Sequence, residues 1–283
     1  KMKEKIDVSI IIPVFNGSKF LKKTIDSCLN QTLISKIEII VIDDCSSDES
    51  EEIINDFKER VRFYKNNDNR GIIYSANRGL EIANGEFLMF LGHDDLIATD
   101  HVEKILGEFD KNTSFVFCGS IVINARDEVI KNYSIANNIS KMIKKPHYYL
   151  VKGNFINSCG LLLRKEYALK IGGFSREFRH YGEWDLWIKL AEFGNIKFSK
   201  KVKSFYRRHD TNITNTLFGN EMPNDLFQYL YNCKKLSFCK GNFTFKQSIY
   251  LKYLIMRFRL SFYRSQILIS IVKNFKTKPI LNN

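Results

Sequence analysis

Short apolar runs alternate with amphipathic stretches along the first half of the chain. Residues 8–12 and 38–42 are short runs rich in Val and Ile, typical of strands buried on both faces, and a third and a fourth strand are expected at 61–64 and 87–91. The stretches in which apolar residues recur at helical spacing are 20–29, 53–57, 73–83 and 102–109. This alternation predicts an α/β fold with right-handed crossovers and a mainly parallel, Rossmann-like sheet flanked by helices.

Two of the predicted helices carry polar residues suited to their first turns. Ser46 and Glu49 have the spacing of a capping box ahead of the helix that carries Ile53 and Phe57. Asp100 and Glu103 are expected to cap the helix that follows the fourth strand.

Two predicted strands end in pairs of aspartates, Asp43-Asp44 and, after Gly92-His93, Asp94-Asp95. Parallel strands place their carboxyl ends on one edge of a sheet, where open α/β proteins bind ligands. Four carboxylates in one crevice repel each other unless a cation or hydrogen-bond donors offset them. A single pair is commonly only a turn or N-cap feature. Two pairs in equivalent places favour a functional site.

Six segments resemble, in order and spacing, the family 2 glycosyltransferases, which have the GT-A fold. The resemblance covers roughly residues 6–215 and is carried by VSIIIPVFNGSKFLKKTIDSCLNQT, IEIIVIDDCSSDES, NRGIIYSANRGLEIANGEFLMFLGHDD, GLLLRKEYALKIGGF, GEWDLWIKLAEFG and YRRHDTNIT. It implies transfer of a sugar from a nucleotide-sugar donor to a hydroxyl, with inversion at the anomeric carbon.

The resemblance also implies which residues bind the nucleotide sugar. They are Pro13, Phe15, Asp43, Asp44, Arg70, Asn77, Asp94 and Arg207. Phe15 would present an edge or a stacking face to the base, although plain core packing explains it equally well. Asp43 or Asp44 would accept a hydrogen bond from a pyrimidine ring N–H, which favours a UDP- or dTDP-sugar.

The implied metal ligands are Asp94, Asp95 and His209. Asp94 matches the second aspartate of the family's Asp-x-Asp, whereas Gly92 replaces the first and removes a ribose contact. Carboxylate ligands suit Mn²⁺ or Mg²⁺, and a histidine ligand favours Mn²⁺. If binding does not depend on metal, diphosphate stabilisation would pass to the basic run 207–209.

An inverting transfer needs a base to take the acceptor's proton. The resemblance places it just before the segment Trp184-Asp185-Leu186-Trp187. Glu183 matches the family's general-base position, where Asp is commoner, and Asp185 is the competing candidate. N-capping or first-turn stabilisation explains Asp185 without any catalytic role.

Charge divides the chain near residue 222, giving a catalytic domain over 1–222 and a basic, aromatic, helical extension over 223–283. The net charge is +13, yet residues 226–283 contain eleven Lys and Arg and no Asp or Glu. This composition favours an interfacial helix on an anionic membrane surface. Helices packed on the catalytic domain are the alternative, and nucleic-acid binding is not expected because no known module frames this extension.

The remaining composition favours a cytoplasmic enzyme, peripheral at the inner face of the plasma membrane. The six cysteines form no disulfide or zinc pattern, and no signal peptide or spanning helix is expected. Abundant Lys, Ile and Asn indicate an AT-rich bacterial source. The predicted function is therefore hexosyl or N-acetylhexosaminyl transfer to a glycan or lipid-linked saccharide acceptor in surface polysaccharide or lipopolysaccharide assembly.

Two other functions stay open at this point. A non-catalytic relative that binds a nucleotide sugar or glycan is kept in view by Gly92 and by Glu183 in place of Asp. A nucleotidyltransferase would need a glycine-rich phosphate loop after the first strand, and residues 13–17 do not form one.

Overall fold

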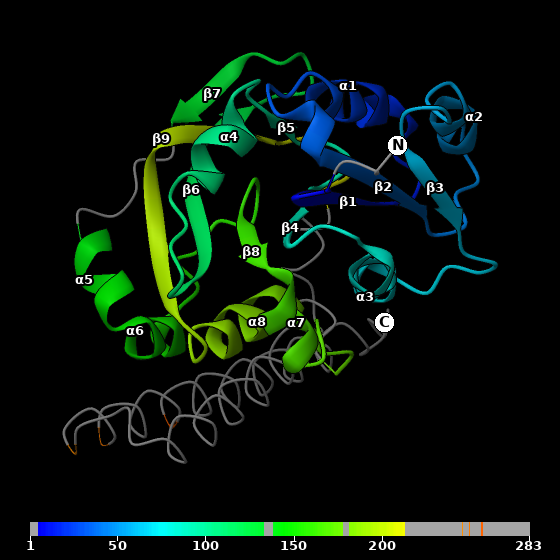
Figure 1. The fold of residues 1–283 in the computed structure, drawn as a ribbon. Coiled ribbons are helices and arrows are strands. Elements are labelled where there is room, and N and C mark those ends of the chain that lie inside the picture. The colour runs from blue at the N-terminus through cyan, green and yellow to red at the C-terminus, as the bar shows by residue number, and fades with distance from the viewer. Residues whose placement is uncertain are drawn as a thin grey trace, which may run out of the picture.

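The computed structural model describes residues 5–132, 138–177 and 181–212, together with the single residues 245, 249 and 256. A curled sheet with helices on both faces makes up this part of the chain (Figure 1). Its strands are β1 Val8–Val14, β2 Ile37–Asp43, β3 Arg62–Lys65, β4 Phe87–Phe90, β5 Leu96–Ile97, β6 Thr113–Ile123, β7 Val129–Asn132, β8 Leu162–Arg164 and β9 Asn195–Arg207. Its α-helices are α1 Ser18–Leu29, α2 Ser50–Asn55, α3 Ile72–Ile82, α4 His101–Leu106, α5 Ile139–Lys144, α6 Pro146–Lys152, α7 Lys165–Lys170 and α8 Gly182–Leu190, and a 3₁₀ turn spans Ile34–Lys36.

The sheet order is β3-β2-β1-β4-β8-β6-β9-β5, with β7 paired to β6. Strands β1 to β4 are mutually parallel, as the alternating pattern predicts, and the α/β fold class is confirmed. The sequence did not predict β8, which is antiparallel to both β4 and β6, or β5, which is antiparallel to β9. Strand β9 runs parallel to β6 and ends beside β5. This pairing carries residues near 207 to the aspartates that precede β5.

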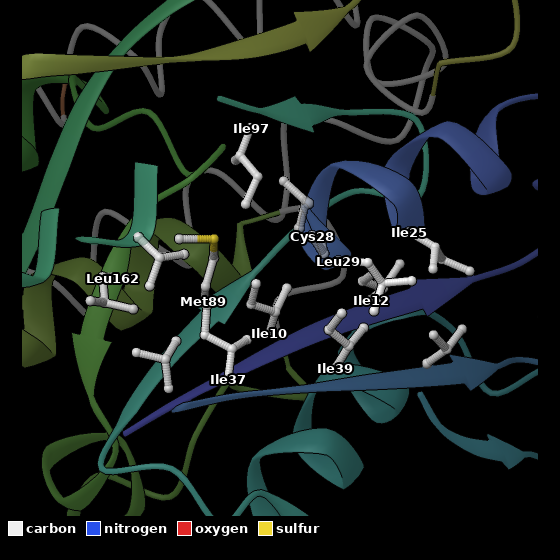
Figure 2. Packing of buried hydrophobic residues seen from close by; sticks show 14 of the residues in the cluster. Ile10, Ile12, Ile25, Cys28, Leu29, Ile37, Ile39, Met89, Ile97 and Leu162 are labelled. Carbon is white, nitrogen blue, oxygen red and sulfur yellow. The ribbon is translucent and has the colours of Figure 1, made fainter. Parts of the chain in front are cut away.

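The central strands are buried on both faces, as continuous apolar runs require. Alternate residues of β1 enter two different core clusters. Ile11 packs with Ala76 and Leu80 of α3, whereas Ile10 and Ile12 face α1. The α1 side, with Ile25, Cys28 and Leu29 over Ile10, Ile12 and Ile39, is shown in Figure 2. The sheet edge is therefore held firmly from both sides.

Two capping expectations are wrong. Helix α2 begins at Ser50 with no side-chain cap, and Ser46 Oγ instead accepts a hydrogen bond from Asn16 N at 2.9 Å. The hydroxyl therefore ties two loops together rather than closing its own helix. Asp100 does occupy the N-cap position of α4 but makes no capping bond, because its carboxylate pairs with Lys104 at 2.5 Å.

Several sequence predictions concern residues that the structure does not describe. The boundary near 222 and the basic extension over 223–283 belong to this group and stay predictions. Within the described ranges, no helix is long and apolar enough to cross a membrane. The cysteines there, at 28, 45, 118 and 159, are all free thiols.

Candidate functional site

The carboxylate of Asp44 organises the loops at the carboxyl ends of β2 and β3. Its Oδ1 accepts hydrogen bonds from Asn66 Nδ2 at 2.6 Å, Ser75 Oγ at 3.1 Å and Arg70 N at 3.1 Å, and its Oδ2 accepts one from Gly71 N at 2.7 Å. Burial of this charge, which is 3% exposed, is offset by these four donors. One acceptor position on Oδ2 remains for a further donor.

Asp43 is fully buried beside it and is only half used by the protein. Its Oδ1 accepts from Ser46 N at 3.0 Å, and its Oδ2 has no hydrogen-bond partner among the described residues. Pro13 is buried in β1 opposite Ile42 of β2. Phe15 follows β1 with 44% of its side chain exposed, so core packing does not account for it. The strand ends therefore present one aromatic face beside two carboxylates.

Arg70 and Asn77 lie on the segment that leads into and through α3. Arg70 is exposed and stacks on Tyr74, with its guanidinium carbon 3.8 Å from the ring centroid. Asn77 is 7% exposed, and both ends of its amide bind the backbone of Phe174 at 2.8 Å. The Asn77 amide therefore anchors the 172–174 loop, and the expectation that Asn77 contacts the nucleotide stays a prediction.

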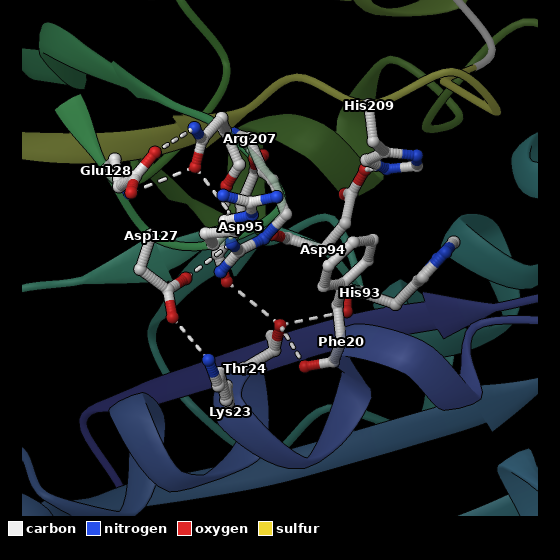
Figure 3. Close-up of polar contacts among 12 residues, drawn as sticks. Phe20, Lys23, Thr24, His93, Asp94, Asp95, Asp127, Glu128, Arg207 and His209 are labelled. Atoms are coloured by element: carbon white, nitrogen blue, oxygen red, sulfur yellow. Dashed lines mark hydrogen bonds and ion pairs between the residues drawn. The ribbon is translucent and has the colours of Figure 1, made fainter. Parts of the chain in front are cut away.

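The structure brings Asp94 and His209 together although 115 residues separate them (Figure 3). His209 Nε2 lies 2.9 Å from Asp94 Oδ2, and Asn212 Nδ2 donates to the same oxygen at 3.0 Å. The backbone N–H of His209 donates to Asn212 Oδ1 at 2.6 Å, which orders the short loop after β9. A Cβ at position 92 would lie 2.8 Å from Asp94 Oδ1. Gly92 therefore leaves room for the Asp94 carboxylate in this position.

Asp95 lies behind Asp94 rather than beside it. It is 6% exposed, and its Oδ1 accepts the backbone N–H of Arg207 at 2.9 Å. Burial, together with the neighbouring Asp94 charge, raises the pKa of Asp95 well above its usual range. In the described part of the chain, no three or more His, Cys, Asp or Glu side chains gather in a group that could hold a metal. Asp95 therefore has contacts that suit a residue anchoring the end of β9.

Arg207 is 0% exposed, and the expectation that it contacts the nucleotide stays a prediction. Its Nε donates to Asp94 O at 2.7 Å, and its Nη1 donates to Asn124 O at 2.9 Å and to the carboxylate of Asp127. Nη2 is buried without a partner among the described residues. The guanidinium packs 4.6 Å from the ring centroid of Phe20. Arg207 thus supports the Asp94 backbone from behind, whereas Arg208 is exposed.

Glu183 lies in the first turn of α8. Its carboxylate accepts a hydrogen bond from Ser158, and the thiol of the next residue, Cys159, hydrogen-bonds to Asp95. Glu183 is thereby linked to the aspartate turn only indirectly, through Ser158 and its chain neighbour Cys159. Solvent reaches its side chain, yet the protein around it desolvates the carboxylate and raises the pKa of Glu183. A raised pKa suits a group that must accept a proton near neutral pH.

Asp185 differs from Glu183 in burial and in partner. It is 2% exposed and pairs with Lys189, one helical turn later, at 2.6 Å. Burial raises the pKa of Asp185, while Lys189 opposes the shift. These contacts fit a structural role in α8. Trp187 is also core, at 1% exposure, and Trp184 Nε1 donates to Leu150 O at 2.9 Å.

Several residues that contact the site residues were not predicted from the sequence. They are Thr24, Asp127, Ser158 and Asn212. Asn212 had a local signal, since it follows His209 by three residues in a segment already singled out. The others lie on segments that only the folded sheet brings to the site.

Comparisons with known proteins agree with this architecture. The model of the family Glycosyl transferase family 2 matches residues 9–172. An uncharacterized glycosyltransferase of Rickettsia typhi is 32% identical over 213 residues, which cover 74% of this chain and 66% of that protein. The chondroitin synthase of Escherichia coli is 29% identical over 206 residues, covering 69% of this chain and 28% of the synthase. This chain thus matches less than two thirds of either relative's length.

Solved structures show the same fold at low identity. Residues 1–349 of Staphylococcus aureus TarS, in complex with UDP-GlcNAc, superpose with a TM-score of 0.69 at 16% identity, covering 91% of this chain and 73% of that one. The mannosyltransferase PcManGT of Pyrobaculum calidifontis, in complex with GDP-Man and Mn²⁺, gives 0.56 at 15% identity, covering 98% and 89%. With the family match over residues 9–172, these likenesses show that the chain belongs to the family 2 glycosyltransferases and has their GT-A fold.

Proposed function

We propose that this glycosyltransferase moves a sugar from a UDP- or dTDP-sugar to a hydroxyl of a glycan or lipid-linked saccharide, with inversion at the anomeric carbon. The observation that carries the proposal is the contact between Asp94 and His209 at the sheet edge that also holds Asp43 and Asp44. Glu183 completes the arrangement from α8.

The nucleoside is assigned to the ends of β1 and β2. Asp44 has an acceptor position left on Oδ2, and the unpartnered Oδ2 of Asp43 lies next to it in the chain. Either oxygen can accept the ring N–H of uracil or thymine, while the exposed face of Phe15 can stack on the base. The UDP-GlcNAc complex of TarS supports uridine as the nucleoside. PcManGT is instead a complex with GDP-Man, so the identity of the nucleobase has to be measured for this chain.

Asp94 and His209 fit a divalent cation held jointly by protein and substrate. Carboxylate Oδ2 and imidazole Nε2 lie 2.9 Å apart, so small side-chain rotations direct both at one ion. Because the described residues add no third His, Cys, Asp or Glu ligand to this pair, diphosphate oxygens and water would fill the remaining positions. The imidazole favours Mn²⁺ over Mg²⁺, and two GT-A relatives are complexes with Mn²⁺. When bound, the ion supplies positive charge to the departing nucleoside diphosphate.

Glu183 is the proposed base. A single inverting displacement needs one group to take the acceptor's proton, on the side opposite the leaving group. The Glu183 carboxylate is reached by solvent, has a raised pKa and is oriented by Ser158. Asp185 is buried against Lys189, so we assign it to the stability of α8.

The acceptor class rests on relatives. GgaB of Bacillus subtilis is a minor teichoic acid biosynthesis protein, and another relative is a chondroitin synthase. We therefore assign this chain to hexosyl or N-acetylhexosaminyl transfer in bacterial surface polysaccharide synthesis. Its association with an anionic membrane surface depends on the 223–283 extension and stays a prediction.

Calorimetry of nucleotide binding tests the donor and the metal together. UDP, dTDP, GDP, CDP and ADP are titrated with Mn²⁺ and with EDTA. We expect UDP or dTDP to bind most tightly and to lose at least tenfold in affinity with EDTA. Binding that ignores EDTA contradicts the Asp94–His209 metal site, and the absence of any nucleotide binding contradicts the transferase proposal.

Donor hydrolysis, measured as release of UDP or dTDP, tests the base. Glu183→Gln is expected to lower kcat about 10²–10⁴-fold with nucleotide affinity unchanged. Asp185→Asn is the matched control on the same helix and should retain most turnover. Loss of turnover in Asp185→Asn with full activity in Glu183→Gln would exchange the two assignments.

A further inference from the structure

Asp127 lies in the tight turn between β6 and β7, with its backbone in the left-handed region at φ 68°. Residues other than glycine seldom adopt this conformation, although Asp tolerates it better than most. Hydrogen bonds within the turn hold it there. Asn124 N donates to Glu128 O at 2.9 Å, and Asn124 Oδ1 accepts from the backbone of Arg126 and Glu128 at 2.8 and 3.0 Å. The turn therefore directs the Asp127 carboxylate one way.

The two oxygens of this carboxylate bind two cations (Figure 3). Oδ1 accepts from Arg207 Nη1, and Oδ2 pairs with Lys23 of α1. The Arg207 side chain is 0% exposed, whereas that of Lys23 is 57% exposed. A buried guanidinium needs its counterion, while an exposed ion pair contributes little. Arg207 is thus the partner that depends on Asp127.

Arg207 in turn holds the aspartate turn at 92–95. Its Nε donates to Asp94 O at 2.7 Å, and its backbone N–H donates to Asp95 Oδ1 at 2.9 Å. Thr24 of α1 holds the same turn from the opposite side, with its hydroxyl 2.8 Å from His93 O and 2.9 Å from Asp95 O. The three residues that follow Gly92 are therefore clamped between a helix and a strand end.

We propose that Asp127 is a positioning residue for the metal and diphosphate site. It fixes the Arg207 guanidinium, which fixes the backbone of Asp94 and so directs the Asp94 carboxylate toward His209. The proposal rests on the proposed function where it takes Asp94 as a metal ligand. Asp127 touches no substrate in this arrangement and acts only through Arg207.

Hydrogen exchange measured by mass spectrometry tests the mechanical part without metal or nucleotide. In Asp127→Asn, amides of residues 91–97 should exchange at least fivefold faster than in the wild type. Glu128→Gln is the matched control, because it loses a carboxylate from the same turn that binds Asn124 rather than Arg207. Lys23→Met breaks only the exposed end of the ion pair. Both controls should leave exchange at 91–97 within twofold of wild type.

Calorimetry tests the functional part. We expect Asp127→Asn to weaken UDP binding in Mn²⁺ about fivefold or more, and to leave the weaker binding in EDTA unchanged. Glu128→Gln and Lys23→Met should match the wild type in both conditions. If Asp127→Asn is too unstable to purify, Thr24→Val removes the opposite half of the clamp and should give the same pattern.

The outcomes separate this proposal from the function on which it rests. Wild-type binding that ignores EDTA contradicts the metal site, while exchange at 91–97 still tests the clamp. Unchanged exchange in Asp127→Asn overturns the clamp even if the metal site is correct. Affinity lost equally in Mn²⁺ and EDTA, or a lower melting temperature with Mn²⁺-dependent affinity intact, means that Asp127 only stabilises the fold.

Discussion

The two aspartate pairs lie at the same edge of the sheet but draw their partners from different distances along the chain. Asp44 is surrounded by donors no more than 31 residues away, on the loop and helix that follow the next strand. Asp94 meets His209 and Asn212, which lie 115 and 118 residues away. The first pair is built by local crossovers, and the second by the docking of β9.

The pairs also divide their work in the same manner. In each pair one carboxylate accepts more backbone N–H hydrogen bonds than the other. Asp95 accepts a hydrogen bond from the backbone N–H of Arg207, and Asp44 accepts one from the backbone N–H of Gly71, just before α3. Asp43 Oδ2 has no hydrogen-bond partner among the described residues, and Asp94 Oδ2 meets His209 and Asn212. A run of two acids is therefore a poor guide to which one is functional until its donors are known.

Asp94→Asn should give the largest effect and is the sharpest test of the difference between the pairs. We expect kcat/KM to fall about 10²–10³-fold, because charge stabilisation of the leaving group depends on this carboxylate. UDP affinity in Mn²⁺ should fall to the value in EDTA, as calorimetry can show. Mn²⁺-dependent binding retained in the variant would contradict the role given to Asp94.

Asp44→Asn should instead affect the fold first. Its carboxylate accepts four hydrogen bonds, and an amide nitrogen facing those donors leaves some of them unsatisfied. We expect the free energy of unfolding to fall by about 2–3 kcal/mol in urea denaturation. UDP binding should weaken equally with Mn²⁺ and with EDTA. Asp68→Asn, an exposed carboxylate in the same loop, is the control and should change neither quantity.

Glu183 allows a smaller test, through the raised pKa of its carboxylate. Its pKa is raised on folding, so the ionised form destabilises the folded state above that pKa. Glu183→Gln should therefore raise the melting temperature at neutral pH, on the order of 1 °C because solvent still reaches the group. The gain should vanish as the pH falls below the ordinary pKa of glutamate. A rise in melting temperature that persists at acid pH would show that the stabilisation comes from packing and not from removal of the charge.

Sequence patterns predict well the elements formed by residues close together in the chain, and poorly the strand pairings between segments far apart in the chain. Apolar runs place β1 to β4 and their helices, because each crossover is decided by nearby residues. They do not reveal that β5 pairs with β9 or that β8 is antiparallel, since those ladders depend on segments far apart in the chain. The capping box at Ser46 fails for the same reason, because Asn16 takes its hydroxyl.

The residues of the candidate site likewise differ in how far the sequence could predict them. Family resemblance points to Asp94, His209 and Glu183, and the structure brings Asp94 and His209 into contact. It also points to Arg207 and Asn77, whose burial could not be foreseen from residue type, since Arg and Asn are usually exposed. Asp127 had no signal at all, because an aspartate in a turn is an ordinary observation.

The pairing of β5 with β9 has a consequence for how the protein is made. β5 follows Asp94-Asp95 directly, yet its partner residues, Ser204 and Phe205, are translated about 110 residues later. On a ribosome that adds about 5–20 residues per second, the β1–β4 unit can form before β9 has emerged. For several seconds the nascent chain would then contain the folded β1–β4 unit with Asp43 and Asp44 in place, while Asp94 still lacks its contact with His209. Catalytic competence is expected to be the last property that the growing chain acquires.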